Sequence, residues 1–184
     1  MRTTGRTRAA TTAITLAATL LLTACGGGDA DRADASAAGT DDRGGAACRT
    51  GDMDVSVEAS PAPATGDTGT VTVNLANQGG TCTLDGFPPV TLATDDTSAR
   101  LVPAEAAAPQ RLTLSAEATA SFTITYVRGE AGAASGFTAQ TAEFALPGDK
   151  TTHRFPWTYG DVAPKADGGE GPDATVGAFQ AAGD

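Results

Sequence analysis

Hydrophobic and polar residues alternate along much of the chain between residues 48 and 161. The clearest stretches are 70–76, 121–126 and 152–159, in which every second residue is β-branched, aromatic or leucine. A period of two places one face of an extended strand on a core and the other face in water. Shorter stretches of the same kind lie at 53–57, 81–84, 90–93, 100–102, 111–114 and 142–146.

Turn-forming residues separate these stretches, at 77–80, 86–89, 94–96 and 147–149. No stretch has the sustained 3.6-residue period of a helix, although residues 129–136 are expected to hold a short turn. Many short strands with turns at this spacing predict an all-β fold, an antiparallel β-sandwich of about seven to nine strands. Pro156 removes a ladder donor, so we expect the last strand to be an edge strand or bulged there.

The first 24 residues have the parts of an export signal. Arg2, Arg6 and Arg8 precede an apolar run over 9–24 that is interrupted only by threonines. This run of 16 residues is shorter than the roughly 20 that span a bilayer. A basic start, a short apolar region and small residues before a cleavage point predict a secretory signal peptide over 1–24.

The signal ends in Leu22-Thr23-Ala24-Cys25, which resembles the lipobox of bacterial lipoproteins. In that motif the cysteine thiol receives a diacylglyceryl group, which anchors the mature chain to the membrane. We therefore expect lipidation of Cys25 and an extracytoplasmic protein on the outer face of the cell membrane. The alternative is an ordinary signal cut near Ala24, with Cys25 incidental.

Two further segments contain few residues that can form a core. Residues 26–47 contain no valine, isoleucine, leucine or aromatic residue, so 25–47 is expected to be a disordered tether. Residues 162–184 are rich in glycine, alanine and aspartate and are expected to be a disordered acidic tail, unless Val176 and Phe179 form a docking turn. The rest of the chain, residues 48–161, is expected to form one β-sandwich domain.

The charge balance excludes one class of partner. The chain has 12 Lys and Arg against 22 Asp and Glu, and three of the arginines lie in the signal. The remaining chain therefore has nine basic and 22 acidic residues, a formal charge of −13. Such a surface argues against nucleic acid binding, which needs a basic footprint, and against a second, electrostatic contact with anionic lipid.

Lipidation of Cys25 leaves one cysteine pair, Cys48 and Cys82. An exported location permits disulfides, so this even remainder is expected to form one structural bridge. The alternative is a redox pair, but the spacing is not C-x-x-C and no histidine is near in the sequence.

Several segments together resemble the domain-of-unknown-function 4232 family of actinobacterial secreted proteins and lipoproteins. They are CRTGDM at 48–53, NLANQGGTCTLDGFPPV at 74–90, LTLSAEATA at 112–120 and FALPGD at 144–149. The resemblance covers about 48–159 and implies an immunoglobulin-like β-sandwich without an established activity. Glu117 stands where the family's turn usually has glycine, and this chain lacks the second cysteine pair of many members.

The segment at 74–90, which is the most specific of these, also has a physical interpretation. Cys82 and Leu84 are expected to point inward, and Gly86 to allow a corner with positive φ. Phe87 is expected to plug one end of the sandwich.

Candidate chemistry is sparse. His153 is the only histidine and cannot by itself complete a histidine metal site, and no nucleophile motif accompanies it. Asp52 with Asp54, or Asp95 with Asp96, offers oxygens to calcium, but solvated turn acids are the commoner case. We therefore expect no catalytic residue, no metal and no cofactor. Trp157 and Tyr159 fit the alternation and are expected in the core; the alternative is a surface recognition patch.

These observations favour a non-enzymatic, membrane-tethered monomer that binds an unknown cell-envelope or extracellular partner. Two alternatives remain. One is a small cell-envelope hydrolase or wall-modifying enzyme, and the other is a structural spacer without a ligand.

Overall fold

The computed structural model of the protein describes residues 45–182. The predicted signal peptide over 1–24, the predicted lipidation of Cys25 and most of the predicted tether over 25–47 lie outside these residues. The described part consists almost entirely of strands and turns. Its elements are a 3₁₀ turn η1 (Thr50–Asp52) and twelve strands: β1 (Met53–Ser60), β2 (Thr68–Asn77), β3 (Cys82–Leu84), β4 (Val90–Ala93), β5 (Ser98–Arg100), β6 (Val102–Pro103), β7 (Leu112–Leu114), β8 (Thr119–Val127), β9 (Thr141–Ala145), β10 (Thr152–Pro156), β11 (Ala174–Val176) and β12 (Gln180–Ala181).

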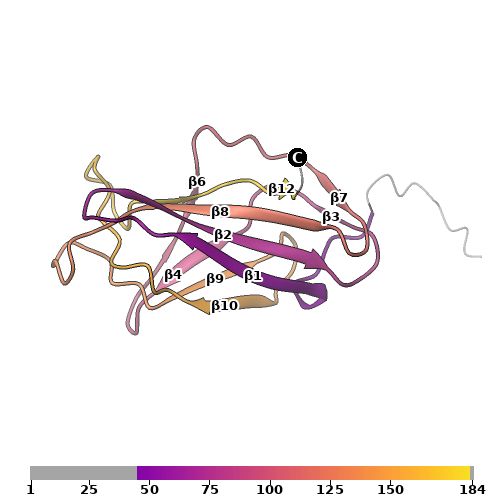
Figure 1. Cartoon of the computed structure of the whole chain (residues 1–184), viewed down its shortest axis with the longest axis horizontal. Coiled ribbons are helices and arrows are strands. Elements are labelled where there is room, and N and C mark those ends of the chain that lie inside the picture. The colour runs from indigo at the N-terminus through magenta and orange to yellow at the C-terminus, as the bar shows by residue number, and fades with distance from the viewer. Residues whose placement is uncertain (1–44, 183–184) are drawn as a thin grey trace, which may run out of the picture. The chain divides into compact units, whose positions relative to one another are not determined.

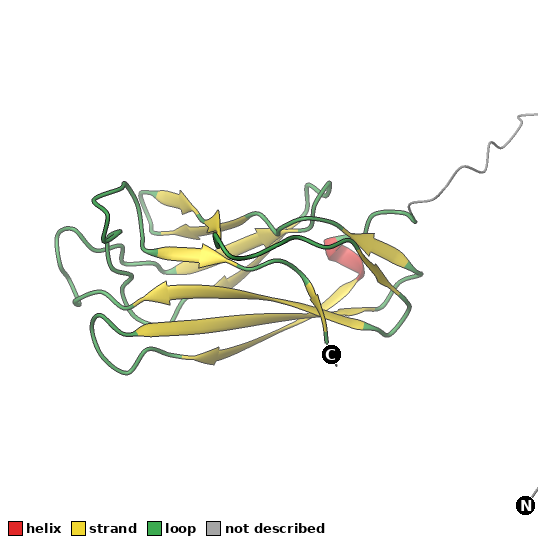
Figure 2. Ribbon diagram, turned by 90° about the horizontal axis from the view of Figure 1, so that it is seen from above, coloured by secondary structure: helices red, strands yellow, loops and turns green. Residues whose placement is uncertain are grey.

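The strands form two main layers (Figures 1 and 2). One sheet has the order β1-β2-β8-β11-β6, with β12 also paired to β8, and the other has the order β10-β9-β4-β5. A third, two-stranded sheet is formed by β3 and β7. All these pairs are antiparallel except β6 with β11. The predicted all-β sandwich is confirmed, with twelve strands rather than seven to nine because several have only two or three residues.

The core lies between the two main sheets. Phe122 of β8 packs edge-on against Phe144 of β9, with 5.2 Å between ring centroids, and both side chains are buried. The alternating residues predicted to face inward do so: Val71, Val73 and Leu75 of β2 are fully buried. The period-two pattern therefore identified the correct face of each long strand.

The chain changes layers at Leu101. It leaves the smaller sheet at the end of β5 and joins the edge of the larger sheet as β6, and the buried Leu101 lies between them. The Leu101 N–H donates to the Val90 carbonyl at 2.9 Å. This crossing joins the two layers covalently at one side of the sandwich.

The carboxy-terminal segment belongs to the domain, so the predicted disordered tail over 162–184 and the domain limit at 161 are wrong. Strand β11 lies between β8 and β6, and β12 extends the pairing along β8. Val176 and Phe179 are only 1% and 2% exposed. The segment is rich in small residues, and two of these, Ala174 and Ala178, are buried as well.

Of the other local predictions, three are confirmed and one is wrong. Gly86 has a φ of +81°, as predicted for the corner after β3. Residues 129–136 do hold short turns, and Pro156 lies on β10, an edge strand. Phe87 does not plug the sandwich: its side chain is half-buried, while the neighbouring Pro88 is buried. The corner directs the proline, rather than the phenylalanine, into the interior.

Candidate functional site

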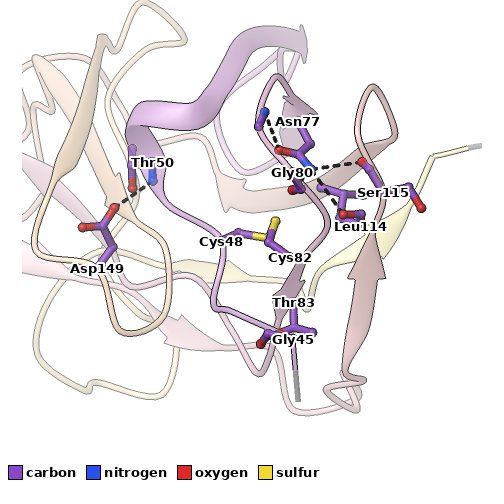
Figure 3. The surroundings of a disulfide bond; sticks show 11 residues. Gly45, Cys48, Thr50, Asn77, Gly80, Cys82, Thr83, Leu114, Ser115 and Asp149 are labelled. Atoms are coloured by element: carbon purple, nitrogen blue, oxygen red, sulfur yellow. Dashed lines mark hydrogen bonds between the residues drawn. A yellow bond between two sulfur atoms is a disulfide. The ribbon is translucent and has the colours of Figure 1, made fainter. Parts of the chain in front are cut away.

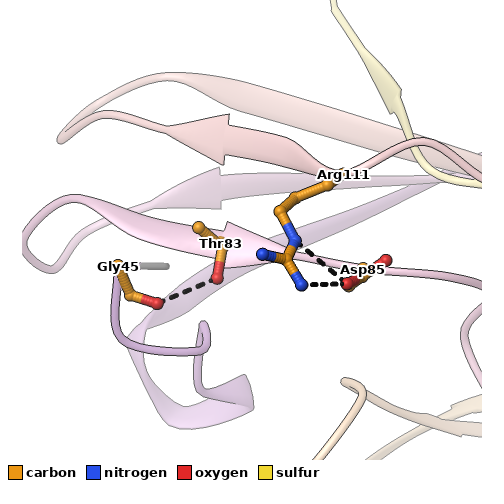
Figure 4. Close-up of polar contacts among 4 residues, drawn as sticks. All are labelled: Gly45, Thr83, Asp85 and Arg111. Carbon is orange, nitrogen blue, oxygen red and sulfur yellow. Dashed lines mark hydrogen bonds and ion pairs between the residues drawn. The ribbon is translucent and has the colours of Figure 1, made fainter. Parts of the chain in front are cut away.

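The chain enters the sandwich beside β3. The Cys48 N–H donates to the Thr83 carbonyl at 3.0 Å, and the Thr83 N–H donates to the Ala46 carbonyl at 2.9 Å. The Thr83 hydroxyl also donates to the Gly45 carbonyl, as Figure 4 shows. Residues 45–48 are thus held as a short parallel addition to β3, so residues 45–47, which the prediction assigned to the tether over 25–47, belong to the folded domain.

A disulfide joins this segment to the sandwich. Cys48 and Cys82 are bonded, with 4.9 Å between their Cα atoms, and both are buried (Figure 3). The predicted pairing is therefore confirmed in the structure. The bond fixes the first residue of the domain to a strand 34 positions later.

A second attachment holds the segment from the other sheet. Thr50 is buried, and its backbone N–H donates to Asp149 Oδ2 at 2.7 Å. The Thr50 hydroxyl donates to the Thr151 carbonyl at 3.0 Å. The other Asp149 oxygen, Oδ1, accepts the Thr151 N–H. These backbone donors hold the Asp149 pKa at about 2, below its usual 3.8.

Asn77 ties together two turns beside the disulfide (Figure 3). It is 1% exposed, and its Nδ2 lies 2.9 Å from the Gly80 carbonyl and 3.0 Å from the Ser115 carbonyl. Its Oδ1 accepts the Gly79 N–H. A buried amide whose donors and acceptor are all used in this way fixes the ends of β2 and β7 together.

These attachments border an open cleft of about 700 Å³ between the entering chain and the β9–β10 turn. It is lined largely by backbone and small side chains. Its charged residues are Arg49 and Lys150 with Asp52 and Asp149. A smaller cleft of about 240 Å³ shares Arg49 and Asp52 and reaches the Asn77 turn. The size is that of a ligand site, and the lining offers hydrogen bonds and charges of both signs.

The sequence did not predict Thr50, Asn77 or Asp149 as site residues. Each carried a weak signal: Asn77 opens an Asn-Gln-Gly-Gly turn, and Asp149 follows Pro-Gly. A turn signal predicts a local reversal of the chain, but not a hydrogen bond to a residue 99 positions away.

Of the other candidates, Asp52 lines this cleft, and the remaining ones do not. His153 is partly exposed on the edge strand β10 and packs on Phe144 at 5.4 Å. Asp52 lies in η1 and Asp54 on β1, so the two do not share a strand face. Asp95 accepts the Gln140 side-chain amide. Among residues 45–182 no group of three or more potential metal ligands comes together.

Trp157 is in the core, as expected, and is 5% exposed. It packs edge-on against Tyr126 and Tyr159, and its indole N–H donates to the Gly160 carbonyl. Tyr159 is half-buried, and this desolvation raises the pKa of its hydroxyl. The Tyr126 ring covers Gly69 on the neighbouring strand, where an added Cβ would lie 2.6 Å from a ring carbon.

Within residues 45–182 no helix is long and apolar enough to cross a bilayer. Comparison with curated proteins finds no match, and neither does comparison with solved structures. Comparison with protein families matches residues 48–180 to the family described as "Domain of unknown function (DUF4232)". The matched segment runs from the disulfide cysteine to the first residue of β12 and includes all the strands from β1 to β11. The chain belongs to the domain-of-unknown-function 4232 family.

Proposed function

We propose that this protein is an extracytoplasmic lipoprotein, anchored to the outer face of the cell membrane through a lipid on Cys25, whose β-sandwich is a non-enzymatic binding module. The observation that carries the proposal is the buried disulfide at the point where the chain enters the domain. Disulfides persist in oxidising compartments and are rare in the cytosol. Its position 23 residues after Cys25 agrees with a lipobox followed by a spacer and a domain outside the cell.

Binding is assigned to the sandwich because of the cleft beside Arg49 and Lys150. Its walls are fixed by the disulfide, by the Thr50–Asp149 hydrogen bond and by Asn77, so little ordering is needed when a ligand enters. The ligand is taken to be a component of the cell envelope, because the anchor would hold the cleft near the membrane.

The competing functions differ in what they require. A hydrolase needs a nucleophile with a base, or paired carboxylates, facing one cleft. The cleft has two carboxylates, Asp52 and Asp149, but both Asp149 oxygens already accept backbone N–H groups, and Cys48 is in a disulfide. A structural spacer needs no cleft, so the cleft favours a binding module over a spacer.

The test is an envelope-binding experiment. The mature chain with Cys25→Ser is mixed with detergent-solubilised cell-envelope extract, and retained material is identified by mass spectrometry. The paired variant Arg49→Ser/Lys150→Ser removes both cations from the cleft and keeps its walls. The proposal predicts material retained by the first protein and lost with the second. Retention that is equal for both proteins, or none, contradicts a binding role for the cleft.

A further inference from the structure

Strand β1 is an open edge of the larger sheet. It pairs only with β2, and the register runs unbroken from Met53 opposite Asn77 to Ser60 opposite Thr70. The strand has eight residues and contains no proline, lysine or bulge. It therefore presents a long, regular row of backbone groups on its free side.

The other three edges of the two main sheets are protected. Strand β6 has two residues and ends in Pro103, and β5 has three residues. Strand β10 contains Pro156, and its Arg154 forms an ion pair with Glu143 on the sheet face. Short strands, prolines and charges are the means by which proteins block unwanted pairing at sheet edges. Strand β1 carries two exposed carboxylates, Asp54 and Glu58, but it alone of these four edges is both long and free of proline, which marks its edge as a surface that pairs.

The ladder shows which backbone groups are free. The Gln78 N–H donates to the Asp52 carbonyl, and the Asn77 N–H donates to the Ala118 carbonyl. Because hydrogen-bonded pairs alternate along an antiparallel ladder, even-numbered residues of β1 bond to β2. The N–H and C=O groups of Val55, Val57 and Ala59 consequently point to the open side.

We propose that two copies of this chain associate through antiparallel pairing of β1 with β1, about a two-fold axis at Val57. In this register the two Val57 residues exchange backbone hydrogen bonds, and Val55 does so with Ala59 of the second copy. The larger sheets then form one continuous sheet across the pair.

The side chains of β1 select this partner and this register. On the outer face Ser56 lies opposite Glu58, and Asp54 opposite Ser60, so no two carboxylates face each other. Moving the axis by one residue, to Ser56, places Asp54 opposite Glu58 and is disfavoured by like-charge repulsion. On the inner face the half-buried Val57 meets its own copy. A strand whose central valine matches its own copy in size, and whose carboxylates lie opposite serines in this register, fits a second copy of this chain.

The test is the association state of the mature chain with Cys25→Ser, measured by sedimentation velocity up to about 1 mM. The proposal predicts a concentration-dependent dimer. Val57→Pro removes the central donor on the free edge and should weaken the dimer about tenfold or more. Val57→Ala is the matched control, because it loses the same side-chain packing and keeps the donor. A chain that stays monomeric at all concentrations overturns the proposal, as does a dimer that Val57→Pro leaves unchanged.

The register is tested by cross-linking in the same background. Ser56→Cys and Glu58→Cys variants, mixed and oxidised, should form a mixed disulfide dimer in excess over either variant alone. Dimers formed equally well by Ser56→Cys alone would place the axis at Ser56 and contradict the proposed register.

Discussion

The backbone N–H of Thr50 donates to the Asp149 carboxylate at 2.7 Å across 99 residues of sequence. Thr50 lies just after the disulfide, and Asp149 lies in the turn that joins β9 to β10. The hydrogen bond therefore attaches the start of the domain to the sheet opposite β1. Together with the disulfide it determines the position of the chain where it enters the sandwich.

This contact predicts a stability that depends on acid pH. The pKa of Asp149 is about 2 in the folded protein against 3.8 for an ordinary aspartate. The contribution of ionised Asp149 to the free energy of unfolding is complete above about pH 4. It is lost as the pH falls from about 4 to about 2, because the unfolded chain binds the proton more readily than the folded chain does. Urea unfolding across this range should show a shallower dependence on pH for Asp149→Asn than for the wild type. Equal slopes would contradict the assignment.

The carboxy-terminal strands should be essential for folding. Phe179 is 2% exposed and packs edge-on against Phe122, with 5.9 Å between ring centroids. Phe179→Ala should lower the free energy of unfolding by about 3–5 kcal/mol. The exposed neighbour Gln180→Ala, as control, should change it by less than about 0.5 kcal/mol. A chain that ends at Asp161 should lack cooperative unfolding; a cooperative transition in that chain would contradict the place of β11 in the sheet.

Glu117 offers a stabilising substitution. It is exposed, and its φ of +64° lies in the left-handed region, which favours glycine. Glu117→Gly should raise the free energy of unfolding by about 0.5–1 kcal/mol, since relief of the strain exceeds the added flexibility of the unfolded chain. Glu117→Ala serves as control and should give no such gain. A urea midpoint that does not rise for the glycine variant would show that the turn is unstrained.

The disulfide should make a large contribution to stability. A closed loop spanning 34 positions corresponds to about 4 kcal/mol in the chain-entropy description. Cys48→Ser/Cys82→Ser should unfold at a markedly lower temperature, and alkylation of the unreduced exported protein should modify neither cysteine. Two alkylated thiols at these positions would refute the bridge.

The sequence predicted the long strands because their burial alternates over many residues, as in Val71, Val73 and Leu75. The sequence did not predict the carboxy-terminal strands, because Ala174–Val176 is too short to show a period of two. The same limit applies to the site. Cys48 and Cys82 were found by counting cysteines, whereas the Thr50–Asp149 contact depends on how two distant turns pack.

A composition rich in alanine and glycine predicts a disordered segment, but residues 163–182 belong to the folded domain. Ala174 in β11 and Ala178 between β11 and β12 are both buried. A small side chain is then a packing requirement and not a sign of disorder. Composition alone does not distinguish the two situations.

The proposed membrane anchoring depends on Cys25 as the lipid-bearing residue, and metabolic labelling tests this role directly. Cells that express the full chain are fed a palmitate analogue, and the protein is recovered from membrane and medium fractions. Wild type and Thr23→Ala, which keeps a small residue before the cysteine, should be labelled and found with the membrane. Cys25→Ser should be unlabelled and lost from the membrane fraction. A Cys25→Ser protein that still takes up the label would contradict the account.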